Sequence, residues 1–394
     1  MRRVLTVLAG STLLSTAAIA EDVKLGIIFG FTGPIESLTQ PMAAAAELAM
    51  KEATDSGIFL GGSTVSSVRG DSTCIDSAAA VSAAERLVTS DKVNAIVGGD
   101  CSGVTGAILQ NVARPNGIVM ISPSATSPAL STAEDDGLFF RTSPSDARQG
   151  QIMTEILMEQ GITKVPVTYT NSDYGKGLAE AFEAAFTAAG GTVTLNAAHE
   201  DGKADYSAEV GALAAAGGDR LVIAGYIDQG GGGVLRAALD AGAFDSFHFP
   251  DGLLSVPLAA PFGSAIDGST GQHPGTDSPG AAAVADMGKA NGFDGTSPFA
   301  PESYDAAALL ILAMQAAGSS ASADLKDKVM EVANAPGEKI YPGELAKALK
   351  ILADGGDVDY VGGSAVELIG PGESAGNYRQ IEISGGKIAT VRYR

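Results

Sequence analysis

The sequence of 394 residues contains no tryptophan, only two cysteines and only three histidines. A structural or catalytic zinc site needs three or four cysteine, histidine or acidic ligands at short spacings. The histidines stand far apart at His199, His248 and His273 and do not have ligand spacing. We therefore expect no bound metal, and no motif indicates another cofactor.

Basic residues are also scarce, with 25 Lys and Arg against 46 Asp and Glu and a formal net charge of −21. Such an acidic chain is repelled by phosphate backbones and by anionic membrane surfaces, which excludes nucleic acid as a partner. The simplest explanation of the acidity is solubility in a salty medium. Beyond the first twenty residues, no segment has the 18 consecutive apolar residues of a membrane span.

Catalytic motifs are missing as well. The sequence has no H-E-x-x-H and no P-loop. The run Gly230–Gly233 lacks the glycine spacing of a dinucleotide site, so we expect a permissive loop that opens a helix, with a phosphate cradle as the alternative. We expect no enzyme activity; a secreted hydrolase or lyase on a similar fold is the alternative from another class.

Residues 1–20 have the pattern of a secretory signal peptide. Arg2 and Arg3 form the charged start, an apolar stretch covers 4–14, and Ala-Ile-Ala at 18–20 forms a cleavage site. A membrane anchor is the alternative, but serines and threonines interrupt the apolar stretch. We expect export and cleavage after Ala20.

Export would place the two cysteines in an oxidising compartment. In such a compartment, a single pair such as Cys74 and Cys101 indicates a disulfide. Each cysteine follows a predicted strand, so the two could lie at the same edge of one sheet. A metal site would need further ligands, which the sequence does not offer.

Short apolar runs alternate with helical patterns along most of the chain. This rhythm predicts α/β architecture, with mostly parallel sheets and helices on both faces. In the first half we expect strands at 23–29, 65–71, 93–99 and 118–121, and helices at 43–53, at 75–88 and from Ser102 onward.

The rhythm restarts after residues 139–144, which indicates a second lobe. Expected helices are 149–160, 177–188, 206–216 and 233–241, and expected strands are 164–170, 192–197, 220–224 and 247–250. Pro166 indicates a sheet edge or a bulge, because proline cannot donate to the ladder. Residues 263–280 lose periodicity and predict a crossing or a surface loop. Helices at 303–317, 323–332 and 344–352 follow, and then a strand at 379–383 whose hairpin partner is 387–393.

Two neighbouring predicted strands end in small hydroxyl-bearing residues. One leads into Ser102, and the other stops at the stretch 122–126. Ligands of open parallel sheets bind outside the carboxyl ends of the strands. The helix that begins near Ser102 adds unpaired N–H groups and a positive dipole end, which suit a carboxylate. The sequence therefore predicts half of a site for a small anionic or zwitterionic molecule.

The chain also resembles a known family over nearly all of residues 22–390. The segments that carry the resemblance are Thr32-Gly33-Pro34, Gly98-Gly99-Asp100-Cys101-Ser102, Ile121-Ser122-Pro123-Ser124-Ala125-Thr126, Asp173-Tyr174-Gly175, Gly225-Tyr226 and Tyr304-Asp305-Ala306. They are similar to the Leu/Ile/Val-binding protein family, the type I periplasmic solute-binding proteins of ABC importers. No single segment is specific for this family, but the whole set in this order, together with the signal peptide, is specific for it.

The resemblance implies two doubly wound lobes joined by a multi-strand hinge. Their expected boundaries are 21–143 plus 273–377 and 144–272 plus 378–394. It implies a periplasmic monomer that binds a free aliphatic or branched-chain amino acid in the cleft and delivers it to a membrane permease. The alternative is the same scaffold retuned for another small carboxylate, an aromatic acid or an amide.

The resemblance also implies roles for single residues. The expected ligand-binding residues are Ser102 at the carboxylate with Cys101 before it, Thr126 at both carboxylate and ammonium, and Ser124, whose backbone carbonyl accepts from the ammonium. Tyr174 and Tyr226 are expected to cover the ligand, and Asp251 to be the counter-ion of the ammonium. Cys74 and Cys101 match the family's disulfide. A simpler reading makes the hydroxyls ordinary caps, the tyrosines rim residues, and Asp251 with Gly252 a turn.

Three residues depart from the family's pattern. Leu38 stands where relatives often have tyrosine, and Phe299 and Glu302 border the same cleft with unusual chemistry. We expect these positions to shape the part of the pocket that receives the ligand's side chain.

Overall fold

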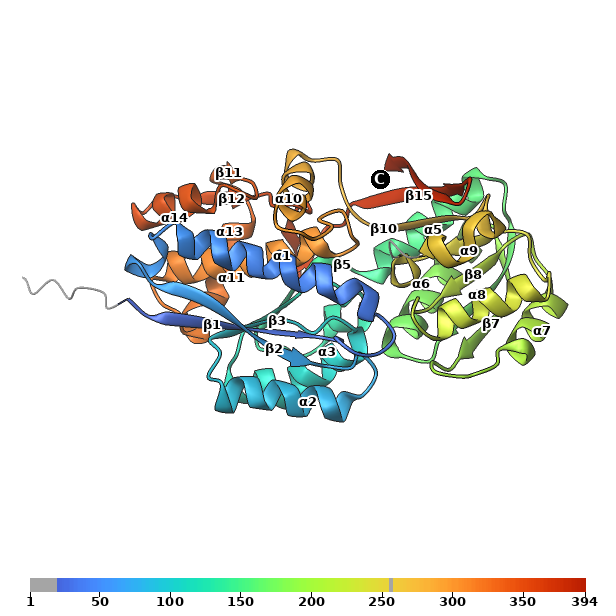
Figure 1. Ribbon diagram of the computed structural model, residues 1–394, viewed down its shortest axis with the longest axis horizontal. Helices are drawn as coiled ribbons and strands as arrows, with labels where there is room; N and C mark the ends of the chain where they lie inside the picture. Colours follow the sequence, from blue (N-terminus) through green and yellow to red (C-terminus); the bar gives the residue numbers. More distant parts are fainter. Residues whose placement is uncertain (1–19, 255–257) are drawn as a thin grey trace, which may run out of the picture.

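The computed structural model describes residues 20–254 and 258–394, which form two α/β lobes side by side (Figure 1). Each lobe contains a seven-stranded sheet. The strand orders are β13-β14-β5-β4-β3-β1-β2 in lobe 1 and β16-β15-β10-β9-β8-β6-β7 in lobe 2. The predicted fold class is confirmed. Residues 1–19, nearly all of the expected signal peptide, lie outside the described residues.

The sheet of lobe 1 is parallel except where β13 meets β14. Its strands are β1 (Asp22–Phe29), β2 (Thr64–Asp71), β3 (Ala95–Gly98), β4 (Met120–Ser122), β5 (Phe139–Pro144), β13 (Leu368–Ile369) and β14 (Glu373–Ser374). Strands β3, β4 and β5 are buried along their whole length, as parallel strands covered on both faces must be.

The helices of lobe 1 cover both faces of this sheet. They are α1 (Glu36–Asp55), α2 (Ser77–Glu85), α3 (Ser102–Ile108), α4 (Arg114–Asn116), α10 (Pro279–Ala290), α11 (Ala300–Ala317), α12 (Ser322–Leu325), α13 (Val329–Ala333) and α14 (Leu345–Ala353). A small parallel pair, β11 (Glu338–Ile340) and β12 (Val358–Tyr360), lies beside them. Helix α11 is buried along most of its length, because alanine and leucine occupy nearly all of its faces.

Lobe 2 repeats this plan and adds a C-terminal hairpin. Its strands are β6 (Lys164–Thr170), β7 (Thr192–His199), β8 (Leu221–Ala224), β9 (Phe247–Phe249), β10 (Thr270–Pro274), β15 (Tyr378–Ser384) and β16 (Lys387–Tyr393). Its helices are α5 (Asp146–Glu159), α6 (Asp173–Ala188), α7 (Ser207–Ala216), α8 (Gly230–Asp240) and α9 (Ala259–Phe262). The predicted hairpin of 379–383 with 387–393 is confirmed by the antiparallel pairing of β15 with β16.

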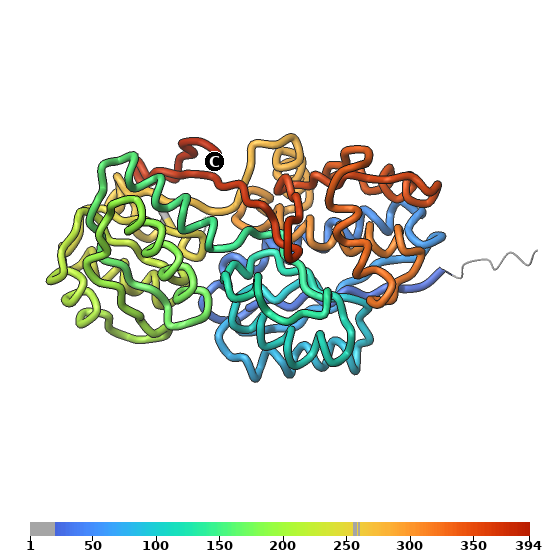
Figure 2. The backbone as a smooth tube through the Cα atoms, turned by 180° about the vertical axis from the view of Figure 1, so that it is seen from behind, coloured from blue at the N-terminus to red at the C-terminus, as the bar shows by residue number. Residues whose placement is uncertain are grey.

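The chain passes between the two sheets three times: after β5, after β10 and after β14. In Figure 2 these crossings are the green, gold and red segments between the lobes. Strands β10 and β15 pair antiparallel from Thr270 to Pro274. The second crossing begins after β10 and the third ends at β15, so these two crossings are held together at their lobe 2 ends.

The prediction of a crossing or a surface loop over 263–280 is wrong for much of this stretch. Residues Thr270–Pro274 form β10, an interior strand that pairs with β9 and β15. The sequence Thr-Gly-Gln-His-Pro has no apolar run, yet all five residues are buried. The strand exists because neighbours on both sides take up its backbone groups, which no local pattern reports.

Two further local predictions need correction, and the structure decides between the two alternatives for Pro166. Strand β6 pairs with both β7 and β8, so Pro166 is not at an edge; it lies at a shift in the β6–β7 register, as the bulge alternative requires. The run Gly230–Gly233 is not a loop but the first turn of α8. Glycine is needed there because a Cβ on Gly232 would lie 2.2 Å from the carbonyl oxygen of Ile227. The expected helix 323–332 is divided into α12 and α13.

Within the described ranges, no single helix is long and apolar enough to cross a membrane. Only α11 together with the segment Ser322–Ala333 meets the length and composition, and the two are bent by 91°.

Candidate functional site

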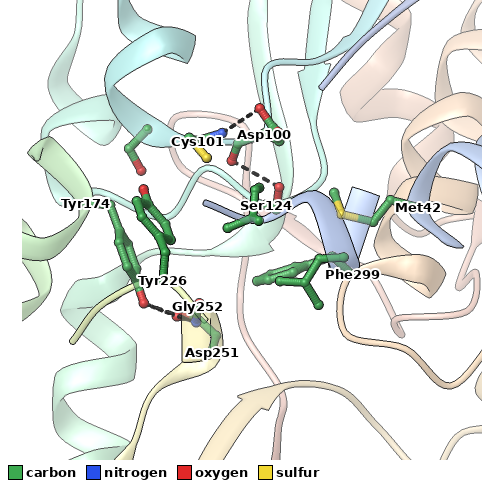
Figure 3. A pocket seen from close by; sticks show the side chains of 12 residues that line it. Met42, Asp100, Cys101, Ser124, Tyr174, Tyr226, Asp251, Gly252 and Phe299 are labelled. Carbon is green, nitrogen blue, oxygen red and sulfur yellow. Dashed lines mark hydrogen bonds between the residues drawn. The ribbon is translucent and has the colours of Figure 1, made fainter. Parts of the chain in front are cut away.

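A cavity lies between the lobes (Figure 3). It opens at the carboxyl ends of β3 and β4 on one side and of β8 and β9 on the other. This is the position at which open α/β sheets bind ligands. The lining residues are Ile35, Leu38, Met42, Asp100, Cys101, Ser102, Ser124, Tyr174, Tyr226, Asp251, Gly252 and Phe299.

The lobe 1 wall is polar and begins at helix α3. Cys101 is extended and Ser102 is the first helical residue, so the first-turn amides have no partner within the helix. The Ser102 hydroxyl oxygen accepts a hydrogen bond from the Ser127 N–H at 3.1 Å. The Ser124 hydroxyl donates to the carbonyl oxygen of Asp100 at 3.0 Å. This wall therefore offers the first-turn amides of α3 and the Ser102 hydroxyl as donors to an anionic group, whereas the Ser124 hydroxyl already donates to Asp100.

A disulfide bond and a set of hydrogen bonds to Asp100 hold this wall in place. The disulfide Cys74–Cys101 joins the loop after β2 to the start of α3, with a Cα–Cα distance of 5.2 Å, and confirms the predicted pairing. The Asp100 carboxylate accepts from the Ser72 hydroxyl at 3.0 Å, from the Cys101 N–H at 2.9 Å and from the Gly30 N–H. Burial raises the pKa of Asp100, and these donors oppose the rise.

The lobe 2 wall combines two aromatic rings with an acid. Tyr174 and Tyr226 stack with ring centroids 5.2 Å apart and an interplanar angle of 20°. The Tyr174 hydroxyl donates to Oδ1 of Asp251 at 2.6 Å, and the Gly252 N–H donates to the same oxygen at 2.8 Å (Figure 3). The second oxygen, Oδ2, is buried and has no hydrogen-bond partner in the described part of the chain. Burial raises the pKa of Asp251.

The rest of the wall is apolar. Ile35, Leu38 and Met42 lie one turn apart at the start of α1, and Phe299 precedes α11 in a left-handed conformation with φ 64°. Met42 and Phe299 stand across the cavity from the stacked tyrosines (Figure 3). An apolar group of a ligand would be received here.

The structure brings together six of the seven residues predicted to bind a ligand. Thr126 is the exception: it is fully buried but does not line the cavity, and its carbonyl oxygen accepts from the Asp146 N–H at 2.8 Å. Leu38 and Phe299 line the cavity, whereas Glu302 does not. Glu302 is buried one turn further along α11, and burial raises its pKa to about 8. The ligand roles of all these residues remain predictions.

Sequence reasoning missed the apolar residues Ile35 and Met42. The expected helix began only at residue 43, whereas α1 begins at Glu36. The signal was present, because Ile35, Leu38 and Met42 follow the spacing of one helix face. Pro41 obscured it by suggesting a helix boundary.

The alternative of a phosphate cradle at Gly230–Gly233 is contradicted. The Gly230 N–H donates to Oδ1 of Asp201 at 2.9 Å, so a carboxylate already occupies the start of α8. Among residues 20–254 and 258–394, no group of three or more His, Cys, Asp or Glu side chains could hold a metal ion.

The two lobes are in direct contact at the mouth of the cavity. Oδ2 of Asp228, from lobe 2, accepts from the Ser37 N–H in the first turn of α1 at 2.9 Å. The Asp228 N–H donates to the carbonyl oxygen of Pro34 at 3.1 Å. Helix α1 has no cap from its own N-cap side chain, so a residue of the opposite lobe caps it.

Two hinged α/β lobes, with a cavity between them that carries polar groups from both, define a ligand-binding protein of the closing type. The sequence model of the periplasmic binding protein family matches residues 22–340. The chain belongs to this family.

Two relatives illustrate the sequence likeness. The Leu/Ile/Val-binding protein homolog 3 of Brucella melitensis is 32% identical over 222 residues, which are 56% of this chain and 59% of the relative. That match therefore spans less than two thirds of the relative's length. The Leu/Ile/Val/Thr-binding protein of Salmonella typhimurium is 29% identical over 266 residues, which are 67% of this chain and 71% of the relative.

Solved structures share the fold. The leucine-binding protein LivK from Thermotoga maritima matches with a TM-score of 0.78 and 21% identity, over 94% of this chain and 98% of that one. A solute-binding protein of an ABC transporter from R. palustris, in complex with benzoate, matches with a TM-score of 0.76 and 21% identity, over 94% and 96%. At such identities the likeness establishes the fold alone.

Proposed function

We propose that the protein is the periplasmic substrate-binding protein of an ABC importer and that it binds a free aliphatic amino acid between its lobes. The observation that carries the proposal is that hydrogen-bond donors, an acid and apolar side chains line different walls of the cavity. Donors at the start of α3 line one wall of the cavity, the acid Asp251 lines the opposite wall, and an apolar wall lies beside them. A zwitterion needs donors for its carboxylate and an acid for its ammonium when both are buried.

In this function the two lobes move as bodies about the three crossings, with boundaries at 143/144, 272/273 and 377/378. The ligand first meets the rigid lobe 1 wall, and Tyr174, Tyr226 and Asp251 then close over it. The protein works as an exported monomer after removal of residues 1–20, and delivers its ligand to a membrane permease without turnover. The names of the Brucella and Salmonella relatives support an amino acid as ligand.

A second candidate function is an aromatic acid or another small carboxylate as ligand. The stacked tyrosines with Phe299 would accept an aromatic ring, and the R. palustris structure holds benzoate. Such a ligand has no ammonium and leaves Asp251 without a counter-ion, which disfavours it.

Calorimetry with the mature protein tests the choice. We expect binding of leucine, isoleucine or valine, and no binding of benzoate or of 4-methylpentanoate, which is leucine without its amino group. Tight binding of an acid that lacks an ammonium, with no binding of any neutral amino acid, would exclude the proposal.

The contact between Asp228 and α1 yields a prediction about closure. Asp228→Ala removes the acceptor for the Ser37 N–H, which exists only when the lobes are together. Loss of a helix cap costs about 1 kcal/mol, so we expect a three- to tenfold weaker ligand affinity through faster dissociation. Stopped-flow dissociation measurements check this, with Asp240→Ala, an exposed residue of the same lobe, as the control. An unchanged dissociation rate would show that the contact does not stabilise closure.

A further inference from the structure

Behind Asp251 lies a second buried acid, Asp146, at the start of α5 where the first crossing enters lobe 2. Asp146 is 0% exposed and Asp251 1% exposed. Each has one carboxylate oxygen, Oδ2, without a hydrogen-bond partner among the residues that the structure describes. Only Asp251 lines the ligand cavity.

One glutamine connects the two acids. The Gln149 side-chain amide donates to Oδ1 of Asp146 at 2.6 Å. Its oxygen, Oε1, accepts from the backbone N–H of Asp251 at 3.3 Å and from the Gln272 side-chain amide at 3.1 Å. Because α5, β10 and the turn after β9 all contribute, this chain of polar groups joins the ligand cavity to two of the crossings.

No cation in the described structure forms an ion pair with either acid. The charge of Arg141 in β5 opposes the rise that burial causes in the pKa of Asp146, but the Arg141 guanidinium donates to the carbonyl oxygens of Ala125 and Ser127 at 3.0 and 2.9 Å and is paired with Glu373. The other titratable groups that face the pair are the buried tyrosines Tyr174, Tyr226 and Tyr378, whose pKa values burial and the charges of the acids raise. Two buried carboxylates that influence each other cannot both be ionised at low cost when no cation compensates them.

We propose that Asp146 keeps its proton at neutral pH, so that Asp251 alone carries the negative charge that faces the ligand. A ligand's ammonium in the cavity can compensate Asp251, which lines it, but not Asp146, which does not. Asp146 is thus a positioning residue: as a neutral acid it holds Gln149, and through Gln149 the backbone of Asp251. The identity of the cation rests on the proposed function, whereas the protonation of Asp146 does not.

The electrostatic environment supports this assignment. Burial raises the pKa of Asp146 well above its usual range and the charge of Asp251 raises it further, while the hydrogen bond from Gln149 and the charge of Arg141 oppose the rise. Burial also raises the pKa of Asp251, but hydrogen bonds from Tyr174 and from the Gly252 N–H oppose the rise. The hydrogen bonds agree, because Oδ1 of Asp251 receives two donors and Oδ1 of Asp146 only one, so the proton of the pair is assigned to Asp146.

Infrared spectroscopy of the ligand-free protein tests the protonation directly. At pH 7 we expect the wild type to show the C=O band of protonated carboxyl groups, and Asp146→Asn to lose part of it. Asp251→Asn, the same change on the other acid, should keep that part of the band. Glu302→Gln identifies the contribution of Glu302, a further buried acid, whose pKa burial raises to about 8. A wild type without any such band, or an Asp146→Asn variant with the full band, would overturn the proposal.

Affinity provides the second readout. Asn mimics a neutral acid, so Asp146→Asn should bind the wild-type ligand within about threefold, whereas Asp251→Asn should lose about a hundredfold. A loss of tenfold or more in a folded Asp146→Asn protein would mean that Asp146 acts as a charge, against the proposal. If the wild type itself binds no amino acid, the proposed function fails, while the infrared result still decides the state of Asp146.

Discussion

Asp251→Ala is expected to weaken the binding of a neutral amino acid by about a hundredfold or more. Removing one partner of a buried charge pair costs roughly 3–5 kcal/mol, because the remaining charge stays buried and unpaired. In the proposed function that charge is the ammonium of the ligand, and Asp251 lines the cavity together with the stacked rings of Tyr174 and Tyr226. The variant also frees the Tyr174 hydroxyl, which donates to Asp251 at 2.6 Å. Calorimetry at low ionic strength measures the loss.

Two comparisons make this result specific. Asp240→Ala removes an exposed acid of the same lobe and should leave the affinity unchanged. An acid without an ammonium, such as benzoate, should bind Asp251→Ala no more weakly than it binds the wild type. If the best ligand of the wild type binds the variant with unaltered affinity, no ammonium is recognised at Asp251, and the second candidate function takes its place.

The second large effect concerns stability. We expect the double variant Cys74→Ala/Cys101→Ala to lose about 3–4 kcal/mol of unfolding free energy, because the disulfide closes a loop with a sequence separation of 27 residues. Urea unfolding followed by circular dichroism should show a lower midpoint. The affinity should fall as well, since the bond holds the start of α3, where the carboxylate donors lie.

Chemical reduction supplies the matched control. Wild-type protein treated with a thiol reductant should unfold at the midpoint of the double variant, and the variant should not respond to the reductant. Equal midpoints for oxidised wild type and double variant would mean that the bond contributes nothing to stability in this fold.

Much of the site could be predicted because its lobe 1 half is local in sequence. A strand that ends before Cys101 and a helix that begins at Ser102 follow from one apolar run and its polar continuation. A neighbouring strand that ends at Ser122 places Ser124 at the same edge. Asp251 and Tyr226 follow the ends of lobe 2 strands in the same way. Parallel topology then brings the strand ends together.

Other features depend on contacts between distant segments. β10 was taken for a crossing or loop because its sequence is polar and short, and it becomes a strand only between β9 and β15. Phe299 reaches the cavity because α11, formed by residues far along the chain, packs on α1. Thr126 ends up outside the cavity wall, bonded through its carbonyl oxygen to the first crossing.

The sequence alone therefore determined the α/β class, the disulfide and the polar strand ends, since periodicity, cysteine count and strand termini are short-range properties. Only the tertiary structure decided which groups oppose one another across the lobes. Asp228 caps α1 through a hydrogen bond with Ser37, which is 191 positions away in the sequence. Gln149, which connects Asp146 to Asp251, is 102 positions away from Asp251, to which it is hydrogen-bonded. Such contacts arise from burial and the saturation of polar groups in the folded chain, which no local pattern encodes.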